Sequence, residues 1–440
     1  MPEAAAAALV RRGGGAIRWP RAATVAVFLM HGLLFASWSA HIPQVKAHVG
    51  VNDAGLGLAL LGAPAGSVLA MVVSARLLPR LGSRRMVRAC LLGYCLAGPL
   101  VGLAGSPVAL FAALFAWGAF QGSLDVSMNT QAVTVERAAA RPLMSGFHAS
   151  WSIGALTGAA IGVAGVALGL SLTSQLLLLA VPALAVGEPL AARMLPDPGS
   201  PGPAPPPAAP AAAARAPGRP GFRLSRTVLV LGAIAFASML CEGASADWAS
   251  VLLRGPLRSG AAVAGLGYTA FALTMVLVRL SGNRVLARFR VQSALPVLAA
   301  VAVAGFSAGL AGGRPVTVVA GFAFLGIGLA LIVPTVNSAA GRLPGLSPGT
   351  AIATVSACGW AGFVVGPPLI GELASATSLR TALGVLPLLV AFIVVATALA
   401  PELRAPHHRR PDDAATAPGG PAAARGAVSG RGQDELPEGS

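Results

Sequence analysis

The feature that most constrains this chain is a series of apolar segments, each long enough to cross a lipid bilayer. A bilayer core requires roughly 20 apolar residues per helix. Six such segments lie at about residues 22–45, 54–78, 87–105, 108–132, 143–168 and 172–192, and six more at about 227–253, 260–280, 291–311, 315–339, 349–373 and 379–401. With 55% hydrophobic and only 10% charged residues, a water-soluble fold is excluded. The sequence predicts an all-α integral membrane protein with twelve transmembrane helices.

Polar and Pro-rich stretches divide these segments into two sets. The stretch at 194–225 is rich in Pro and Ala, can bury nothing, and is expected to be a solvated cytoplasmic linker. The predicted organisation is therefore an N-tail at 1–21, a six-helix bundle at 22–193, the linker, a second six-helix bundle at 226–401, and a disordered C-tail at 402–440.

The basic residues indicate how the helices are oriented. If the N-terminus is cytoplasmic, 26 of the 31 basic residues fall on the cytoplasmic side; the exceptions are Lys46, Arg254, Arg258, Arg314 and Arg380. This asymmetry follows the positive-inside rule, so we expect both termini in the cytoplasm. The net charge of +16 is explained by topology, because the basic residues are spread between apolar runs and form no basic domain. A nucleic-acid partner is not expected.

Several chemistries are not expected from this sequence. The cysteines Cys90, Cys95, Cys241 and Cys358 lie inside apolar segments without metal-ligand spacing. No Gly-Lys pair exists, so a Walker-type phosphate loop is absent. Residues 345–349, GLSPG, match the G-x-S-x-G pattern of hydrolases, but they fall in a predicted loop with no strand before it, and we treat the match as coincidence. We expect no enzyme activity, no catalytic residues, no metal and no cofactor.

The two halves look like copies of each other. At an offset of 208, Gly118 falls on Gly326 and Asn129 on Asn337. The same offset places Gly154 on Gly362 and Gly158 on Gly366. These glycines and Gly162 form small-xxx-small faces, which let helices approach closely. The sequence therefore predicts two pseudo-symmetric six-helix bundles in which these five glycines serve helix packing.

The segment between the second and third apolar runs reads ARLLPRLGSRR, residues 75–85. It resembles the Gly-x-Leu-x-Asp-Arg-x-Gly-Arg-Arg signature of the major facilitator superfamily of secondary transporters. The matching residues are Arg80, Gly82, Arg84 and Arg85, whereas Ala75 and Pro79 stand where that family has its Gly and Asp. The resemblance implies a gating loop at this place, without the usual gating salt bridge.

A more specific resemblance is carried by QGSLDVSMNTQAVTVE at 121–136, RPLMSGFHASWSIGALTGA at 141–159 and EGASADW at 242–248. These segments are similar to the bacterial branch of the superfamily related to the fucose:proton symporter. The resemblance implies that Asp125 and Asn129 handle substrate and protons, and that the protein lies in the cytoplasmic (inner) membrane of a bacterium. The branch also has an acid before a Pro-Gln pair, but here Ser39 precedes Pro43 and Gln44. A two-carboxylate mechanism is not simply carried over.

Polar residues inside the apolar segments are candidates for a substrate and proton pathway, because polar groups at membrane depth are costly and usually face a partner or a wet cavity. The resemblance implies that helices one, four, seven and ten line such a cavity. The candidates are Asp125, Asn129, Gln121, Glu242, His31, Trp38, Asp247, His148, Trp151 and Asn337. For each of them the alternative is a structural role, such as a helix-to-helix hydrogen bond or simple packing.

The sequence thus favours a secondary active transporter that moves a small polar solute by alternating access. A sugar-like solute, imported by symport with protons, is favoured by analogy. Two alternatives remain: an exporter of drugs or metabolites with the same fold, and a membrane sensor that binds without transport. The expected partners are the solute, protons and the lipid bilayer, and the expected state is a monomer.

Overall fold

The computed structural model describes residues 15–140, 143–196, 226–288, 291–340, 343 and 348–399. Within these residues the chain is helical almost throughout and contains no strand. Most of the predicted N-tail, linker and C-tail (1–14, 197–225 and 400–440) lies outside the described residues, as does Ser347 of the G-x-S-x-G match.

The first half of the chain forms helices in the order that the apolar segments predict. They are α2 (Gly15–Ser37), η1 (Ser39–His41), α3 (Ile42–Val49), α4 (Asp53–Leu60), α5 (Gly62–Leu81), α6 (Ser83–Val101), α7 (Pro107–Ala139), α8 (Met144–Ala167) and α9 (Leu172–Ala191). The second half contains α10 (Arg226–Arg254), α11 (Ala261–Arg288), α12 (Val291–Gly312), α13 (Pro315–Leu329), α14 (Ile332–Ala340), α15 (Pro348–Ala376), α16 (Leu379–Ala382) and α17 (Val385–Leu399).

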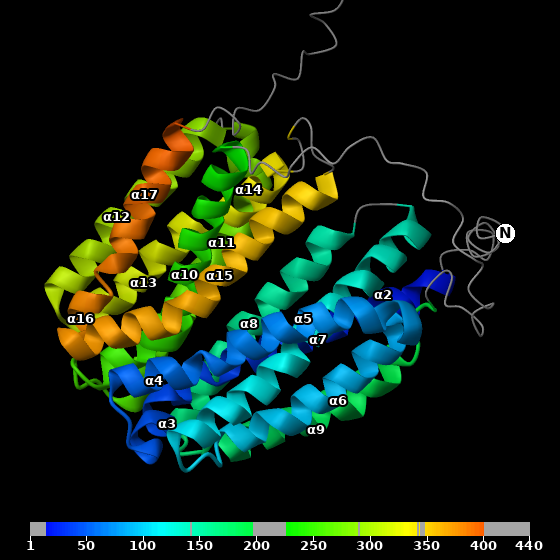
Figure 1. Cartoon of the computed structure of the whole chain (residues 1–440), viewed down its shortest axis with the longest axis horizontal. Coiled ribbons are helices and arrows are strands. Elements are labelled where there is room, and N and C mark those ends of the chain that lie inside the picture. Colours follow the sequence, from blue (N-terminus) through cyan, green and yellow to red (C-terminus); the bar gives the residue numbers. More distant parts are fainter. Residues whose placement is uncertain are drawn as a thin grey trace, which may run out of the picture. The chain divides into compact units, whose positions relative to one another are not determined.

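Eleven spans in the described residues are long and apolar enough to cross a membrane. The remaining predicted span is α6, which has 19 residues and is therefore about 28 Å long. Its first turns carry Arg84, Arg85 and Arg88, which lower its apolar content, but it packs against α7 and α9 over its length like the other spans. The predicted all-α fold with two six-helix sets is confirmed (Figure 1).

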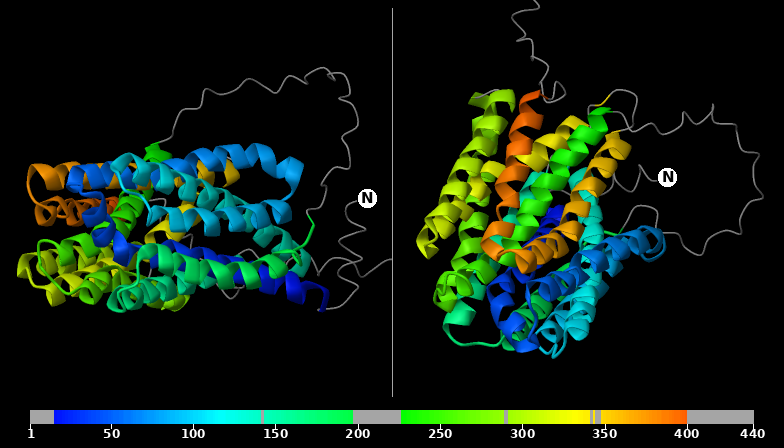
Figure 2. Two further views of the ribbon diagram at one scale, coloured as in Figure 1. Left: turned by 90° about the horizontal axis from the view of Figure 1, so that it is seen from below. Right: turned by 60° about the vertical axis from the view of Figure 1, so that its left-hand side comes forward.

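The two sets repeat the same helix pairings. In the first half α2 packs against α8, α5 against α7, and α6 against α7. In the second half the corresponding pairs are α10 with α15, α11 with α13, and α12 with α13. The views in Figure 2 show the two sets from further directions, α2 to α9 in blue to blue-green and green, and α10 to α17 in bright green to orange. The duplication seen in the sequence is therefore a duplication of packing.

Glycines lie where these paired helices approach most closely. A Cβ at Gly118 would overlap the carbonyl oxygen of Ala63, and a Cβ at Gly326 would overlap that of Phe271, two contacts related by the same offset of 208. Between α2 and α8, a Cβ at Gly154 would overlap the carbonyl oxygen of Leu29. Small residues allow such backbone contact between membrane helices, which is favourable because dispersion and weak polar contacts drive helix association in lipid.

The remaining predicted packing glycines lie at similar places. Gly158 and Gly162 of α8 meet the carbonyl oxygens of Leu33 and Ser37. Gly362 of α15 meets that of Phe236. Gly366 is different, because a Cβ there would lie 3.6 Å from Leu240 Cγ, which is ordinary contact. The second-half helix pair is therefore less tightly packed at this turn.

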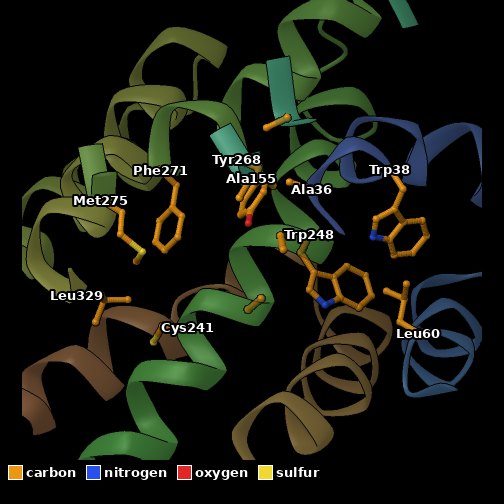
Figure 3. Packing of buried hydrophobic residues seen from close by; sticks show 14 of the residues in the cluster. Ala36, Trp38, Leu60, Ala155, Cys241, Trp248, Tyr268, Phe271, Met275 and Leu329 are labelled. Atoms are coloured by element: carbon orange, nitrogen blue, oxygen red, sulfur yellow. The ribbon is translucent and has the colours of Figure 1, made fainter. Parts of the chain in front are cut away.

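The main contacts between the halves lie toward the helix ends that the charge distribution predicts to face outside. They join α4 to α15, α8 to α11, and η1 and α3 to α10. Ser250 Oγ donates a 2.7 Å hydrogen bond to the carbonyl of Ser39, and Gly57 lies against Gly371. Figure 3 shows Trp248 of α10, which is fully buried, on the side that faces Trp38 and Leu60 of the first half.

Candidate functional site

The predicted polar face of the fourth span lies on α7. Ser106 caps the start of this helix by accepting a 3.2 Å hydrogen bond from the Ala109 amide, and Pro107 occupies the first turn, where a missing N–H costs nothing. Farther along, Asn129 Nδ2 donates to the Asp125 main-chain oxygen at 2.8 Å and to Asp125 Oδ1 at 3.2 Å. Gln121 is one turn earlier, and all three side chains are half-buried.

Asp125, like Asp247 in the second half, differs from the ion-paired acids Asp53, Glu188 and Glu242 in what surrounds it. Among the described residues, no basic side chain lies within ion-pair distance of its carboxylate. The Asn129 amide is the side-chain donor it receives. A carboxylate at this depth without a cation is costly unless it is protonated or reached by water. Asp125 is therefore the first-half acid that we take as the candidate for proton handling.

His31 and Trp151, predicted from separate segments, are hydrogen-bonded to each other. Trp151 Nε1 donates to His31 Nδ1 at 2.7 Å, joining α8 to α2. Since indole can only donate, Nδ1 is the acceptor, and a neutral His31 carries its proton on Nε2. That Nε2 is buried without a hydrogen bond in the described part of the chain and lies near the backbone of Gln121. The Nε2 nitrogen of His31 is thus the ring position still open to a hydrogen-bond partner. It lies beside the turn of α7 that carries Gln121.

Trp38 lies in an aromatic cluster and not on an open surface. It is only 6% exposed and packs edge-on against Trp117, with ring centroids 6.0 Å apart. Trp117 stacks on Tyr94 at 5.2 Å, and Tyr94 in turn lies 5.6 Å from the ring of His31. The cluster packs against the His31 ring through Tyr94. The sequence singled out Trp38 but not Tyr94 or Trp117, which are embedded in apolar runs and carry no polar pattern.

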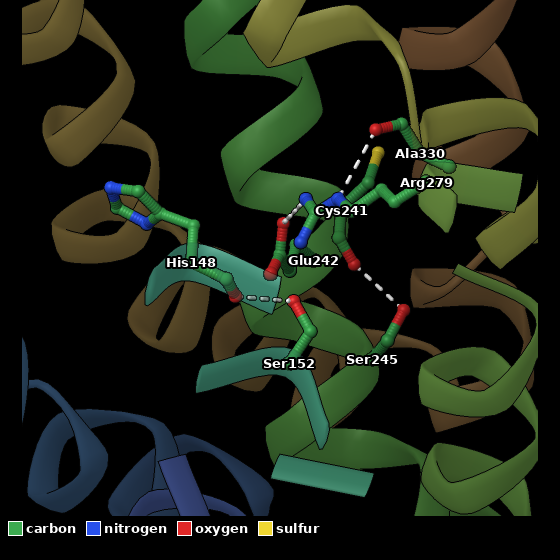
Figure 4. Close-up of polar contacts among 7 residues, drawn as sticks. All are labelled: His148, Ser152, Cys241, Glu242, Ser245, Arg279 and Ala330. Atoms are coloured by element: carbon green, nitrogen blue, oxygen red, sulfur yellow. Dashed lines mark hydrogen bonds and ion pairs between the residues drawn. The ribbon is translucent and has the colours of Figure 1, made fainter. Parts of the chain in front are cut away.

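The second half holds an ion pair inside its helices. Arg279 Nη2 of α11 lies 3.9 Å from Glu242 Oε2 of α10, and Arg279 Nε donates a 3.2 Å hydrogen bond to the carbonyl of Ala330 (Figure 4). The sequence predicted Glu242, but it counted Arg279 only as one of the cytoplasmic-side charges, whereas the residue lies inside α11 and faces α10. The signal that could have found it is its position before the end of the predicted span at 260–280.

The carbonyl of Ala330 is available because of Pro334. In a continuous helix the amide of residue 334 would donate to the oxygen of residue 330, but proline has no N–H. The helix is interrupted between α13 and α14, and the Leu331 carbonyl still receives the Thr335 amide at 3.2 Å. In a membrane an unpaired carbonyl must find another donor. Arg279 supplies that donor from the neighbouring helix.

Four further polar side chains lie on α10 and α11 or on helices that pack against them. Tyr268 of α11 is buried and lies in the electrostatic field of Glu242, Asp247 and Arg279. Asp247 is half-buried on α10, and the charge of Arg279 also acts on His148, which is exposed on α8 of the first half. Asn337 is half-buried on α14, the counterpart of the turn that holds Asn129. Tyr268 and Arg279 are the residues that sequence reasoning missed here.

The predicted gating loop is not a loop. Arg80 lies in the last turn of α5, while Arg84 and Arg85 lie in the first turn of α6. Gly82 alone joins the two helices, with φ 78° and ψ 149°, a conformation that favours glycine. Helices extend beyond their apolar runs because long basic side chains reach toward water from a helical backbone. The expectation of a loop at 75–85 was therefore wrong, although the basic residues do gather at this junction.

Two contacts brace the same end of the first half. Arg88 Nε donates to Glu188 Oε2 at 2.9 Å, joining α6 to α9. Glu136, at the end of α7, accepts the amides of Leu143 at 2.6 Å and Met144 at 2.7 Å, the first amides of α8. A carboxylate at a helix N-terminus is favourable because unpaired amides and the helix dipole both point toward it. The α7 to α8 connection is thus fixed by a side chain.

The fold and the polar residues inside it define a multi-pass membrane transporter with a duplicated helical core. The sequence model of the Major Facilitator Superfamily matches residues 23–253. An uncharacterized MFS-type transporter of Yersinia pestis is 33% identical over 375 residues, which cover 82% of this chain and 91% of that protein. An uncharacterized transporter of Sinorhizobium fredii is 32% identical over 386 residues, covering 88% and 98%. The chain belongs to the Major Facilitator Superfamily.

Other comparisons agree with this assignment. Membrane protein MosC of Rhizobium meliloti is 32% identical over 361 residues, 81% of this chain and 84% of that protein. Among solved structures, the nucleoside transporter NupG superposes with a TM-score of 0.62 at 13% identity, covering 86% of this chain and 98% of that one. A bacterial homologue of the human lysosomal transporter Spinster, in an inward-facing, unoccupied conformation, gives 0.63 at 14%, covering 90% and 100%. At these identities the structures show a shared fold.

Proposed function

We propose that this transporter imports a small, polar, sugar-like solute together with protons by alternating access, as the resemblance to the fucose:proton symporter branch suggests. The observation that carries the proposal is Asp125, a half-buried carboxylate on a membrane helix with no basic partner among the described residues. Such a group is stable at membrane depth when protonated and when water reaches it. A carboxyl that alternates between these situations can carry a proton.

The contacts between the halves support alternating access. They are concentrated at the ends assigned to the outside, where Ser250 bonds to Ser39 and Gly57 meets Gly371. The ends that carry Arg80, Arg85 and the start of α15 are assigned to the cytoplasm. Rocking one half against the other about the closed end is the motion that transporters built from repeats use. We infer an inward-facing arrangement in an inner membrane, with cytoplasmic termini and a monomeric protein.

The proposed substrate class follows from the groups near Asp125. Asn129, Gln121 and His31 can exchange hydrogen bonds with hydroxyl groups, and Trp151 offers an apolar ring held by His31. Amides combined with an aromatic face suit a solute with an apolar face and a hydroxyl rim. These side chains come from α2, α7 and α8 of the first half. The first half is therefore the half to which we assign the uncharged part of the solute.

The test is transport by purified protein in proteoliposomes, with counterflow and gradient-driven uptake measured side by side. Asp125→Asn is expected to abolish proton-driven uptake and to leave counterflow, because exchange requires no net proton release. Glu372→Gln, which neutralises an exposed acid on α15 of the second half, is the control and should retain proton-driven uptake. An Asp125→Asn protein that still concentrates solute in response to a pH gradient would sink the coupling role.

The same measurements decide between the proposal and its alternatives. Solute that leaves the lumen against its own gradient when protons enter indicates an exporter. Saturable binding without any counterflow indicates a sensor. Neither result changes the family assignment, which rests on the sequence matches.

A further inference from the structure

We propose that Arg279 binds a carboxylate group of the transported solute, and that Glu242 is the internal counter-ion which the solute replaces. The inference rests on the proposed transport function and names the charge of the substrate. It concerns the second half of the protein, whereas the proton site and the hydroxyl-binding groups were assigned to the first half.

The guanidinium of Arg279 is held in a fixed orientation. Its Nε donates to the Ala330 carbonyl at 3.2 Å, and that carbonyl is free of helical bonding because Pro334 has no amide hydrogen. With Nε committed to the backbone, the two terminal Nη groups are left for other partners. A planar guanidinium fixed in this way is prepared to bind a planar oxyanion through two parallel hydrogen bonds.

Glu242 neutralises the charge of Arg279 without occupying all the hydrogen-bond donors of the guanidinium. The Nη2 to Glu242 Oε2 distance of 3.9 Å is within ion-pair range but too long for a hydrogen bond. The side chains of Arg279 and Glu242 are 27% and 17% exposed, so the pair can be reached from outside the packed core. A carboxylate that approaches closer than Glu242 gains the hydrogen bonds that Glu242 does not make.

His148 lies on α8, the helix of the opposite half that packs against α11, and it is exposed. Figure 4 shows its ring extending to the side away from Arg279 and Glu242. The carboxylate site is therefore assigned to Arg279 alone.

Replacement of the counter-ion links anion binding to protons. Two carboxylates beside one guanidinium repel each other, so Glu242 must swing away or take up a proton when the solute binds. The other titratable groups that act on this place are Asp247 on α10, Tyr268 on α11 and His148 on α8. Among the other described elements that pack against α10 or α11, α12, α13, α14 and α17 contain no charged side chain or histidine. Glu372 lies on α15, His41 in η1, and His48 and Lys46 on α3, where Lys46 is paired with Asp53. Arg279 is thus the cation that both carboxylates compete for.

The experiment measures ligand affinity by thermal shift on the purified full-length protein, with neutral sugars each paired with its uronate and aldonate, and with a hexose phosphate as a second oxyanion. At least one carboxylate is expected to stabilise the protein more than its neutral parent. Arg279→Gln should lower that carboxylate affinity at least about tenfold. Glu242→Gln should raise it, since the competing carboxylate is removed. Arg254→Gln, at the outer end of α10, is the matched control and should change neither.

Several results would overturn the inference. They are equal affinity for a neutral sugar and its carboxylate, no binding by any carboxylate, preference for the hexose phosphate, or unchanged carboxylate affinity in Arg279→Gln. If that variant does not fold, the opposite shift in Glu242→Gln still decides the matter. Counterflow separates this inference from the proposed function. Exchange of a neutral solute without carboxylate binding would support transport and contradict the carboxylate site. Carboxylate binding without any exchange would support the site and contradict transport.

Discussion

The two halves share a packing scheme but not a chemistry. Gly118 and Gly326 make the same backbone contact at the same sequence offset, and α2 with α8 pairs as α10 does with α15. The polar groups do not follow this symmetry. Asp125 in α7 corresponds to Val333, and Arg279 in α11 corresponds to Met71. Duplication therefore preserved the parts that let helices slide and pack, while the charges diverged.

The divergence has a structural cause in one helix. The α7 helix runs unbroken from Pro107 to Ala139, whereas its counterpart is divided into α13 and α14 at Ala330 and Leu331, just before Pro334. The break presents the Ala330 carbonyl to Arg279, and Arg279 in turn stands beside Glu242. A proline, an arginine and a glutamate thus form one arrangement that the first half lacks. The following substitutions test whether each half depends on its own version.

The largest effect is expected when the break is introduced into the first half. Val126 corresponds to Pro334 by the offset of 208. Val126→Pro removes the amide that bonds to the Gly122 carbonyl, and Met71, at the place of Arg279, cannot donate in its stead. We expect a loss of roughly 3 kcal/mol or more in stability. Thermal unfolding in detergent measures it, with Val126→Ala as control. Unfolding at the wild-type temperature would show that α7 tolerates the break without a donor.

An intermediate effect is expected at a pair of equivalent glycines. A methyl group at Gly158 would meet the Leu33 carbonyl, a backbone atom that can move only with its helix, whereas at Gly366 it would lie 3.6 Å from a flexible leucine side chain. Gly158→Ala should cost about 1–3 kcal/mol and Gly366→Ala less than about 0.5 kcal/mol. The same unfolding assay compares them, with the exposed Gly105→Ala as a further control. Equal losses would mean that the packing is symmetric at this turn.

Much of the fold could be predicted from sequence because membrane helices are recognisable by their length and their apolar composition. All twelve predicted segments contain a helix, and their breaks at η1 and between α4 and α5 went unnoticed because they interrupt apolar runs without changing composition. The gating loop was misassigned for a related reason. Basic residues mark the water boundary but not the end of a helix, so Arg80 and Arg84 were placed in a loop where only Gly82 leaves the helical conformation.

The candidate site was less predictable because its contacts join distant segments. His31 and Trp151 were each singled out, but their 2.7 Å hydrogen bond spans 120 residues of chain and depends on the α2 and α8 packing. The role of Arg279 depends on Pro334, more than 50 residues later, through a carbonyl that has no sequence signal of its own. Polarity inside an apolar run identifies such residues singly. Their pairing requires the packed helices.

The smallest change in stability is expected when the break is removed from the second half. Pro334→Ala restores an amide that can bond to the Ala330 carbonyl, so the helix gains a hydrogen bond of about 1 kcal/mol while Arg279 loses its acceptor. The two changes nearly cancel in the free energy of unfolding, and the unfolding temperature should move little. The guanidinium is then free to rotate onto Glu242, and carboxylate affinity should fall although neither charge has been altered. Pro367→Ala, in α15, is the control proline. If Pro334→Ala binds carboxylates as the wild type does, the backbone contact does not orient Arg279, and the difference between the halves lies in the charges alone.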